Sequence, residues 1–177
     1  MEQADVTTAR LGDFLSYARI RRPHPRPISG KSLIERIITL VADDFAGAGV
    51  ELKSSLEDLC LLADPEMLTQ ILVNLVTNSL RSCSAADVVT VRLFGSGQSA
   101  TIAVEDSGIG MTASELKQIF KPYFSRHHGG YGIGMAIVKR IVDDSDWDMS
   151  VESQPARGAR VTISGIVVEG KNKAKGI

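Results

Sequence analysis

Two glycine-containing clusters hold residue types that suit a nucleotide. The first, Asp106-Ser107-Gly108-Ile109-Gly110, follows an alternating run at 102–105 that predicts a buried strand ending in a turn. An aspartate there can accept a hydrogen bond from a ring amino group, and glycines let a flat ligand approach closely. The second cluster, residues 129–134, opens a helix-like run, and free N–H groups at a helix start suit phosphate. We expect one cluster to hold a base and the other its phosphates.

A polar stripe on a predicted helix adds a third group. Asp64-Pro65 is typical of a helix start, and the apolar pattern continues to about Ser82. The stripe along the edge of its apolar face consists of Gln70, Asn74, Asn78 and Arg81. Asn is a poor helix former, although either Asn alone is most simply a solvated amide. Two amide oxygens a turn apart can also complete the shell of a magnesium ion bound to phosphates and water.

Length, composition and charge limit the class of protein. The 177 residues predict one domain of ordinary size, and 44% hydrophobic with 23% charged residues indicates a globular chain. The net charge of −1 gives no general attraction to nucleic acid or to an acidic membrane. Apolar runs stay below the roughly 18–20 residues of a membrane span, so we expect a cytoplasmic chain, whether or not a longer parent is membrane-anchored. Cys60 and Cys83 lack the spacing of a disulfide framework or zinc site.

The periodicity of the chain predicts the elements that must position these groups. Helices are expected over residues 7–20, 32–47, 64–82, 112–120 and 133–143. Strands are expected over residues 50–52, 58–62, 88–94, 100–105, 147–152 and 159–166, with 88–105 forming a hairpin. Three prolines within 23–27 predict a linker, and the irregular stretch 121–131 predicts a lid between the glycine clusters.

Four motifs in order resemble the catalytic, ATP-binding domain of two-component sensor histidine kinases. They are Asn74-x-x-x-Asn78, Asp106-x-Gly108-x-Gly110, the stretch from Phe120 to Phe124, and Gly130-x-Gly132-x-Gly134. That domain has the Bergerat fold of the gyrase, heat-shock chaperone and mismatch-repair ATPases. Each motif alone is weakly specific, but four in order at compatible spacings are a strong signal. The resemblance covers roughly residues 28–166.

The resemblance implies a fold and a domain division. The fold is a two-layer α/β (α+β) sandwich, in which a mixed, mostly antiparallel sheet of about five strands packs on three helices. Residues 1–27 would be the end of a dimerisation and phosphoacceptor hairpin helix with a proline-rich linker. Residues 28–168 would be the ATP-binding catalytic domain, and residues 169–177 a disordered basic tail.

The resemblance also implies the roles of individual residues. Asp106 would accept from the adenine amino group, while Gly108 and Gly110 let the backbone pass close to the ring. Asn78 and Asn74 would bind the magnesium that bridges the phosphates. The basic residues Arg81 and Arg126 would contact the phosphates, and Gly130, Gly132 and Gly134 would cradle the phosphates at the helix start. Phe120 and Phe124 would be the aromatic residues of the lid.

The implied activity is transfer of the ATP γ-phosphoryl group to a histidine. The three histidines of the chain are His24, His127 and His128, and none is followed by an acidic residue and proline on a helix, as a phosphoacceptor requires. The acceptor is therefore expected on a hairpin outside this chain, with a response regulator as the further partner. We expect this stretch to be monomeric and a longer parent to be a homodimer.

Two other functions remain open. A serine kinase of the anti-sigma-factor type shares this fold, although residues 7–22 look like the end of a hairpin and argue against it. A degenerate domain could use nucleotide only as a switch or dock partners without catalysis. The presence of both Asn residues, Asp106 and the glycines argues against that alternative.

Overall fold

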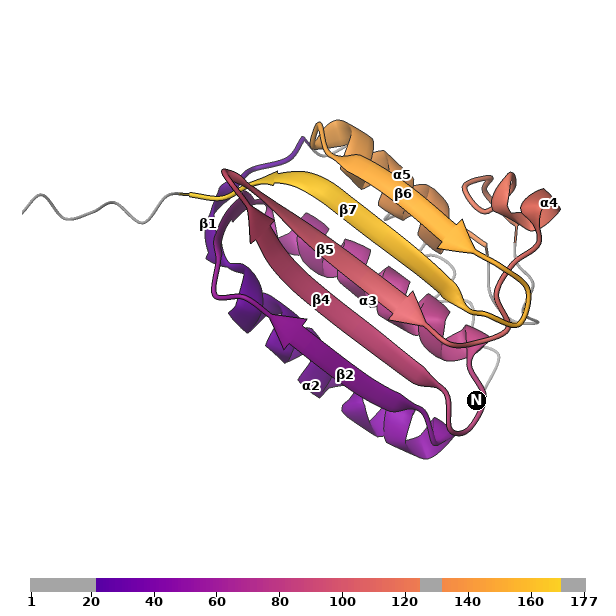
Figure 1. Cartoon of the computed structure of the whole chain (residues 1–177). Coiled ribbons are helices and arrows are strands. Elements are labelled where there is room, and N and C mark those ends of the chain that lie inside the picture. The colour runs from indigo at the N-terminus through magenta and orange to yellow at the C-terminus, as the bar shows by residue number, and fades with distance from the viewer. Residues whose placement is uncertain (1–21, 125–131, 170–177) are drawn as a thin grey trace, which may run out of the picture.

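The chain folds into two layers, a β-sheet and a set of helices that cover one of its faces (Figure 1). The computed structural model describes residues 22–124 and 132–169. The predicted helix over 7–20, Arg126, Gly130 and the basic tail beyond 169 lie outside these residues. Among the described residues, no helix has both the length and the apolar character needed to cross a membrane.

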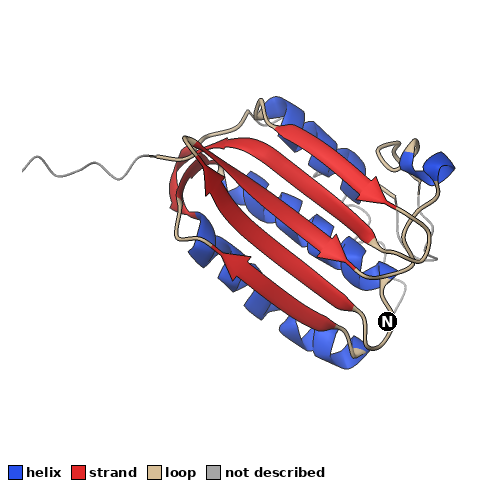
Figure 2. Cartoon of the chain, viewed as in Figure 1, coloured by secondary structure: helices blue, strands red, loops and turns tan. Residues whose placement is uncertain are grey.

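The main sheet has five strands in the order β2-β4-β5-β7-β6 (Figure 2). These strands are β2 (Glu51–Leu56), β4 (Val88–Ser96), β5 (Ser99–Asp106), β7 (Ala159–Val167) and β6 (Asp148–Ser153). β2 pairs with β4 in parallel, and the other neighbours are antiparallel. A separate two-stranded sheet joins β1 (Arg26–Ser29) to β3 (Cys60–Ala63).

The helical layer consists of α2 (Gly30–Ala48), α3 (Pro65–Ser82) and α5 (Gly134–Asp144). A short helix, α4 (Ala113–Leu116), lies beyond the sheet at the end where β5 finishes (Figure 1). The predicted fold class, a mixed and mostly antiparallel five-stranded sheet on three helices, is confirmed.

Several predicted boundaries differ from the structure, and two of these differences have a clear physical reason. Arg26 and Pro27, which we placed in the linker, belong to β1, where an edge strand tolerates the missing N–H of proline. The helix expected over 112–120 ends at Leu116, although its predicted capping box, Thr112 with Glu115, is present. After Leu116 the backbone N–H of Gln118 donates to the Glu115 carbonyl at 2.8 Å, a tighter turn than an α-helix makes.

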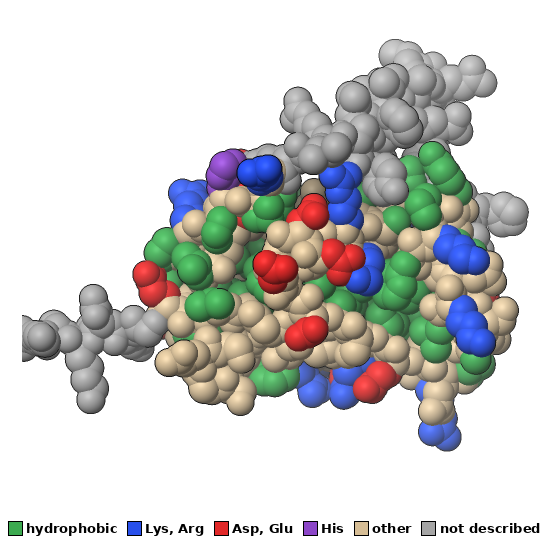
Figure 3. Space-filling model, turned by 90° about the horizontal axis from the view of Figure 1, so that it is seen from above, with side chains coloured by type: hydrophobic (Ala, Val, Ile, Leu, Met, Phe, Trp, Pro, Cys, Tyr) green, Lys and Arg blue, Asp and Glu red, His purple; other side chains and the backbone are tan. Residues whose placement is uncertain are grey.

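The core lies between the sheet and the helices. On β5 the side chains of Ala100, Ile102 and Val104 are almost fully buried, because alternate residues of a strand face the same side. They meet the apolar stripe of α3, formed by Leu68, Ile71, Leu72, Leu75 and Val76. The opposite face of the sheet is polar. There Oε2 of Glu105 forms ion pairs with Nη2 of Arg160 at 2.9 Å and with Nη2 of Arg92 at 3.8 Å. Figure 3 shows another side of the molecule, on which acidic, basic and apolar side chains are interspersed.

The start of α3 is held by one buried carboxylate. Oδ1 of Asp64 accepts from the backbone N–H groups of Glu66 at 3.0 Å and Met67 at 3.2 Å, which the first turn of a helix otherwise leaves unpaired. Oδ2 of Asp64 accepts from the backbone N–H of His24 at 2.9 Å. The cap therefore anchors the entering chain as well as the helix that carries the Asn residues.

We expect Asp64→Ala to lower the free energy of unfolding by about 1 to 2 kcal/mol, the upper part of the range for a helix cap. Three backbone N–H groups would lose their acceptor, and urea unfolding measures the change. The control is Thr112→Ala at the cap of the short, exposed α4, which should cost less. An equal or smaller loss for Asp64→Ala would contradict its anchoring role.

Candidate functional site

Asp106 lies where three elements meet, at the carboxyl end of β5. Its side chain is buried, with 7% of its surface exposed. Oδ1 accepts from the backbone N–H of Gly108 at 3.1 Å and from that of Ala159, the first residue of β7, at 3.3 Å. The carboxylate is thus held in position from the turn and from β7.

The surroundings of Asp106 make its charge costly. Burial raises the pKa of Asp106 above its ordinary value, and the negative charge of Asp87 raises it further. The hydrogen bonds from Gly108, Ser79 and Ala159 act in the opposite direction because they stabilise the ionised form, but burial dominates. A perturbed carboxylate with this arrangement is typical of a functional site rather than of a structural turn.

The predicted glycines Gly108 and Gly110 have a reason within the chain itself. A Cβ on Gly108 would stand 2.2 Å from the carbonyl oxygen of Ser82, the last residue of α3. Gly110 has φ of +61°, and its Cβ would stand 1.9 Å from the carbonyl oxygen of Gln154. The two glycines therefore let the turn pack against α3 and against the β6–β7 connection. Their close approach to a ligand stays a prediction.

The structure brings Gly134, the last glycine of the second cluster, to the Asn pair. Asn74 donates its amide to the carbonyl of Gln70 at 2.8 Å, which directs Nδ2 along the helix. A Cβ on Gly134, the first residue of α5, would stand 2.7 Å from Asn74 Oδ1 and 3.7 Å from Asn78 Nδ2. The absence of a side chain at Gly134 thus lets the Asn74 amide pack directly against the start of α5, a helix start that suits phosphate.

The two predicted clusters lie along one stretch of α3. Gly108 packs on Ser82, and Gly134 lies beside Asn74. At about 1.5 Å of rise per residue, these positions on the helix axis are about 12 Å apart. The base end and the phosphate end of the predicted site therefore share one rigid support.

The described ends of the predicted lid contact each other. The backbone N–H of Tyr123 donates to the carbonyl of Gly132 at 3.0 Å, and a Cβ on Gly132 would stand 2.5 Å from the carbonyl oxygen of Phe124. Phe120 and Phe124 are half-buried. Arg81 is exposed in the last turn of α3.

Sequence analysis missed several residues that build the base end of the site. Asp87 accepts from the backbone N–H of Ser84 and from the Ser107 hydroxyl, each at 2.8 Å, and these hydrogen bonds lower its pKa. Burial, with the charges of Asp106 and Asp87, raises the pKa of Cys83 to about 11, so this thiol stays protonated. Gly158 has φ of +73°, and its Cβ would stand 1.8 Å from the Asp106 carbonyl oxygen. Apart from the local hydrogen bond between Ser84 and Asp87, these contacts join distant parts of the chain, so spacing alone gives little signal for them.

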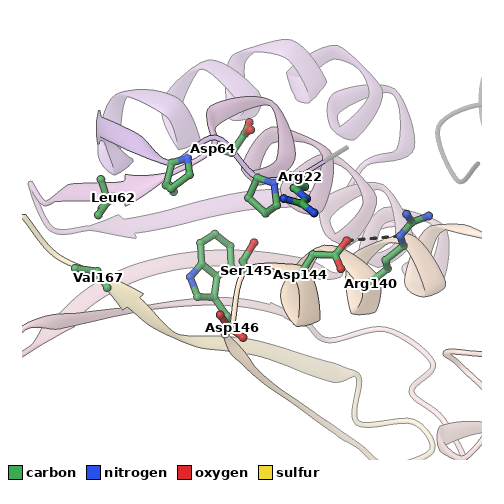
Figure 4. A pocket seen from close by; sticks show the side chains of 12 residues that line it. Arg22, Leu62, Asp64, Arg140, Asp144, Ser145, Asp146 and Val167 are labelled. Atoms are coloured by element: carbon green, nitrogen blue, oxygen red, sulfur yellow. Dashed lines mark ion pairs between the residues drawn. The ribbon is translucent and has the colours of Figure 1, made fainter. Parts of the chain in front are cut away.

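A cavity of about 660 Å³ lies at the opposite end of α3 (Figure 4). It is bounded by the entering chain at Pro23 and Pro25, by the helix cap Asp64 and by Trp147 after α5. Its lining contains neither Asp106 nor the Asn pair, so it is separate from the candidate site.

Comparison with known proteins decides the family. A family model described as histidine kinase-, DNA gyrase B- and HSP90-like ATPase matches residues 63–166, more than half of the chain. The chain belongs to this ATPase family. The match begins at the cap of α3 and ends within β7, so it contains Asp106, both Asn residues and both glycine clusters.

Relatives of this ATPase-family chain include sensor histidine kinases. The sensor histidine kinase ZraS of Klebsiella oxytoca is 33% identical over 97% of this chain and 37% of its own length. The signal transduction histidine-protein kinase AtoS of Escherichia coli strain K12 is 29% identical over 92% of this chain and 27% of its own length. The chain therefore spans between about a quarter and little more than a third of the length of these two relatives.

Solved structures share the fold of this ATPase-family chain. Full-length ShkA in complex with AMPPNP matches with a TM-score of 0.86 and 21% identity, over 96% of this chain and 38% of that one. The mycobacterial sensor histidine kinase MprB matches with a TM-score of 0.73 and 22% identity, over 82% and 99% of the two chains. At these identities the likeness concerns the fold.

We expect Gly108→Ala to destabilise this ATPase-family domain by about 1 to 3 kcal/mol, because the added Cβ would overlap the Ser82 carbonyl. The control is Gly47→Ala within α2, where a Cβ meets nothing within 4 Å. It should stabilise the domain by up to about 1 kcal/mol, since Ala is the better helix former. Urea unfolding compares the two variants, and similar effects would show that the turn does not require close packing.

Asp106→Asn should raise the free energy of unfolding at neutral pH, because it replaces a desolvated carboxylate by a neutral side chain of the same shape. A raised native pKa means that the folded state binds more protons, so the wild-type chain gains stability as pH falls toward the ordinary value of 3.8. The advantage of the variant should therefore shrink through that window. Urea unfolding across the pH range measures this, and an advantage that grows on acidification would refute it.

Proposed function

We propose that this chain is the ATP-binding catalytic domain of a sensor histidine kinase. It transfers the γ-phosphoryl group of ATP to a histidine on a helical hairpin outside this chain. The proposal depends chiefly on the arrangement of these residues around α3. Asn74 and Asn78 lie on this helix, Gly134 lies beside them, and the buried Asp106 lies near its carboxyl end. Membership of the ATPase family and likeness to full-length ShkA in complex with AMPPNP support it.

Asp106 is the residue that selects the base. Its buried carboxylate accepts a hydrogen bond from the adenine amino group, while Gly108 and Gly110 keep the turn close to the ring. A base without a donor at that position would cover the buried carboxylate without adding a hydrogen bond to it, which is a strong penalty. The site therefore prefers adenine by excluding other rings as well as by attracting the right one.

The Asn pair and the glycine cluster serve the phosphates. Asn78 and Asn74 offer amide oxygens, a ligand type that suits Mg²⁺ with water and phosphate as its other ligands, and Gly134 lets the start of α5 lie directly beside them. Bound Mg²⁺ would neutralise charge on the phosphates. Gly130, Gly132 and Gly134 present backbone to the phosphates at the start of α5, where the helix dipole is positive.

The remaining predicted residues complete the same pocket. Arg81 and Arg126 are proposed to contact the phosphates from α3 and from the loop, supplying positive charge where negative charge develops during transfer. Phe120 and Phe124 are proposed to form the apolar lining of the lid. These side chains position the phosphates and neutralise their negative charge, because phosphoryl transfer requires little covalent chemistry from the protein.

The acceptor histidine is proposed to lie outside the described residues. His24 is the histidine within them, and its backbone donates to Asp64 at the start of α3, the end farthest from Ser79 and Asp106. Its place argues against self-phosphorylation there. The proposed partners are the hairpin of a longer parent and a response regulator, the latter supported by likeness to ThkA in complex with response regulator protein TrrA.

The relatives do not favour the serine-kinase alternative, because those described above are named as histidine kinases. We further propose that this stretch is monomeric while a longer parent dimerises through its hairpin. The Pro-rich segment before β1 would link that hairpin to the domain.

Calorimetric titration with ADP and magnesium tests the proposal. Asp106→Asn should weaken ADP binding by about 10- to 100-fold, the value of a hydrogen bond to a charged group. Asn78→Ala should weaken binding in magnesium but change it little in a chelator. Asp44→Asn, an exposed aspartate on α2, is the matched control and should bind normally.

Transfer to a separately supplied phosphoacceptor hairpin then tests the reaction. Labelled phosphate from γ-labelled ATP should appear on the hairpin with the wild-type chain and not with Asn78→Ala. Binding without transfer to any cognate hairpin would favour the switch function. Absence of ADP binding by a folded chain would refute the proposed site.

A further inference from the structure

Asp87 ties the turn that follows Asp106 to the connection between α3 and β4. It lies in that connection, directly before Val88, and its side chain is half-buried. Its Oδ2 accepts from the backbone N–H of Ser84 at 2.8 Å, and its Oδ1 accepts from the hydroxyl of Ser107 at 2.8 Å. One carboxylate therefore bridges the chain that leaves α3 and the first residue of the turn after β5.

Ser107 joins this bridge to the main sheet. Its backbone N–H donates to the Val88 carbonyl at 3.0 Å, and its Oγ accepts from the Val88 N–H at 2.9 Å. Val89 pairs with Asp106, so a continuing antiparallel ladder would pair the Val88 N–H with the Ser107 carbonyl. The hydroxyl oxygen takes the place of that carbonyl, which lets the backbone leave the sheet here. An ionised carboxylate only accepts, so the hydroxyl proton is directed at Asp87 while the oxygen serves Val88.

The far side of the same turn is held by the end of α3. The backbone N–H of Ile109 donates to the carbonyl of Ser82, the last residue of α3, at 3.0 Å. Gly108 lies between this anchor and Ser107, and its N–H donates to Oδ1 of Asp106 at 3.1 Å. The terminal torsion of an aspartate is soft, so the orientation of the carboxylate follows its donors. The position of the Gly108 donor therefore depends on the anchors on both sides of it.

A simpler role for Asp87 is to close its own loop. Its backbone N–H donates to the Ser84 carbonyl at 3.1 Å, and together with the bond from the Ser84 N–H this is typical of a capped turn. That role involves residues 84–87 alone. The Ser107 hydroxyl lies 20 positions away, within the turn that carries the predicted base site, and a local cap does not account for it.

We propose that Asp87 is a positioning residue for base recognition, acting through the Ser107 hydroxyl on the turn that orients the Asp106 carboxylate. The proposal rests on the proposed function, because it assigns Asp87 an effect on that same site. Asp87 keeps the Gly108 N–H aligned with Asp106, so the carboxylate meets the adenine amino group in one orientation.

Binding of two nucleotides separates this role from local capping. Asp87→Ala should weaken ADP binding about fivefold, the value of a typical hydrogen bond, measured by calorimetry. Binding of purine riboside 5′-diphosphate, which lacks the amino group, should change less than about twofold, because no donor then meets the oriented carboxylate. Asp87→Asn keeps an oxygen for one of the two donors, so its ADP affinity should lie between those of wild type and Asp87→Ala. An equal loss for both nucleotides would overturn the proposal and leave Asp87 a turn cap.

The matched control is Glu57→Ala. Oε2 of Glu57 accepts from the backbone N–H of Gly95 at 2.9 Å, near the other end of β4, so this variant also removes a carboxylate that holds a backbone N–H. It should change neither affinity, and an equal loss of ADP affinity there would overturn the assignment to Asp87.

A double variant tests the route through Ser107. Adding Asp87→Ala to Ser107→Ala should cause little further loss of ADP affinity, because both variants break the same link. Full additivity of the two losses would show that Asp87 acts by another route and would overturn the proposal.

A measurement without nucleotide distinguishes failure of this proposal from failure of the proposed function. Relative to the amide of Val104 within β5, hydrogen exchange of the Gly108 amide should be about fivefold faster in Asp87→Ala and unchanged in Glu57→Ala. An unchanged ratio in Asp87→Ala would overturn the link between Asp87 and the turn. No ADP binding by the folded wild-type chain would instead overturn the proposed function, and with it the role in base recognition.

Discussion

The structure depends on a close approach of backbone to backbone at the end of β5. The turn after Asp106 lies so near the last residue of α3 and the start of β7 that Gly108, Gly110 and Gly158 have no space for a Cβ. This approach brings the helical layer, the central strand and the neighbouring strand to one point. The environment of Asp106 follows from this close approach, because a carboxylate at that point is shielded from water and lies beside backbone N–H donors.

Shielding Asp106 gives selectivity at a cost in stability. Its hydrogen bonds reduce the free-energy cost of burying the charged carboxylate without removing it. The carboxylate therefore destabilises the domain without ligand and remains a strong hydrogen-bond acceptor. The proposed phosphate end is built differently, since Asn74 and Asn78 are neutral amides and require no buried charge. Under the proposed function, the charged acceptor for the base and the neutral amides for metal and phosphate lie at different points along one helix.

Local signals predicted much of this fold, and non-local contacts account for the rest. The Asp64 cap, the hairpin of β4 and β5 and the Thr112 capping box each lie within a few residues, and the structure confirms them. The pairing of β1 with β3 was missed because its prolines resemble a linker. Ala159 and Gly158 contact Asp106 across 53 and 52 positions of the chain, so no spacing rule could reveal them.

The open edges of the main sheet have their own physical consequence. β2 and β6 end the strand order, and each leaves backbone groups able to pair with a foreign strand. Glu51 and Lys53 form an ion pair at 3.0 Å along β2, and β6 carries exposed Asp148 and Glu152. An approaching strand would have to desolvate these charges, so the same residues that occupy the solvent face act as a barrier to fibrillar aggregation.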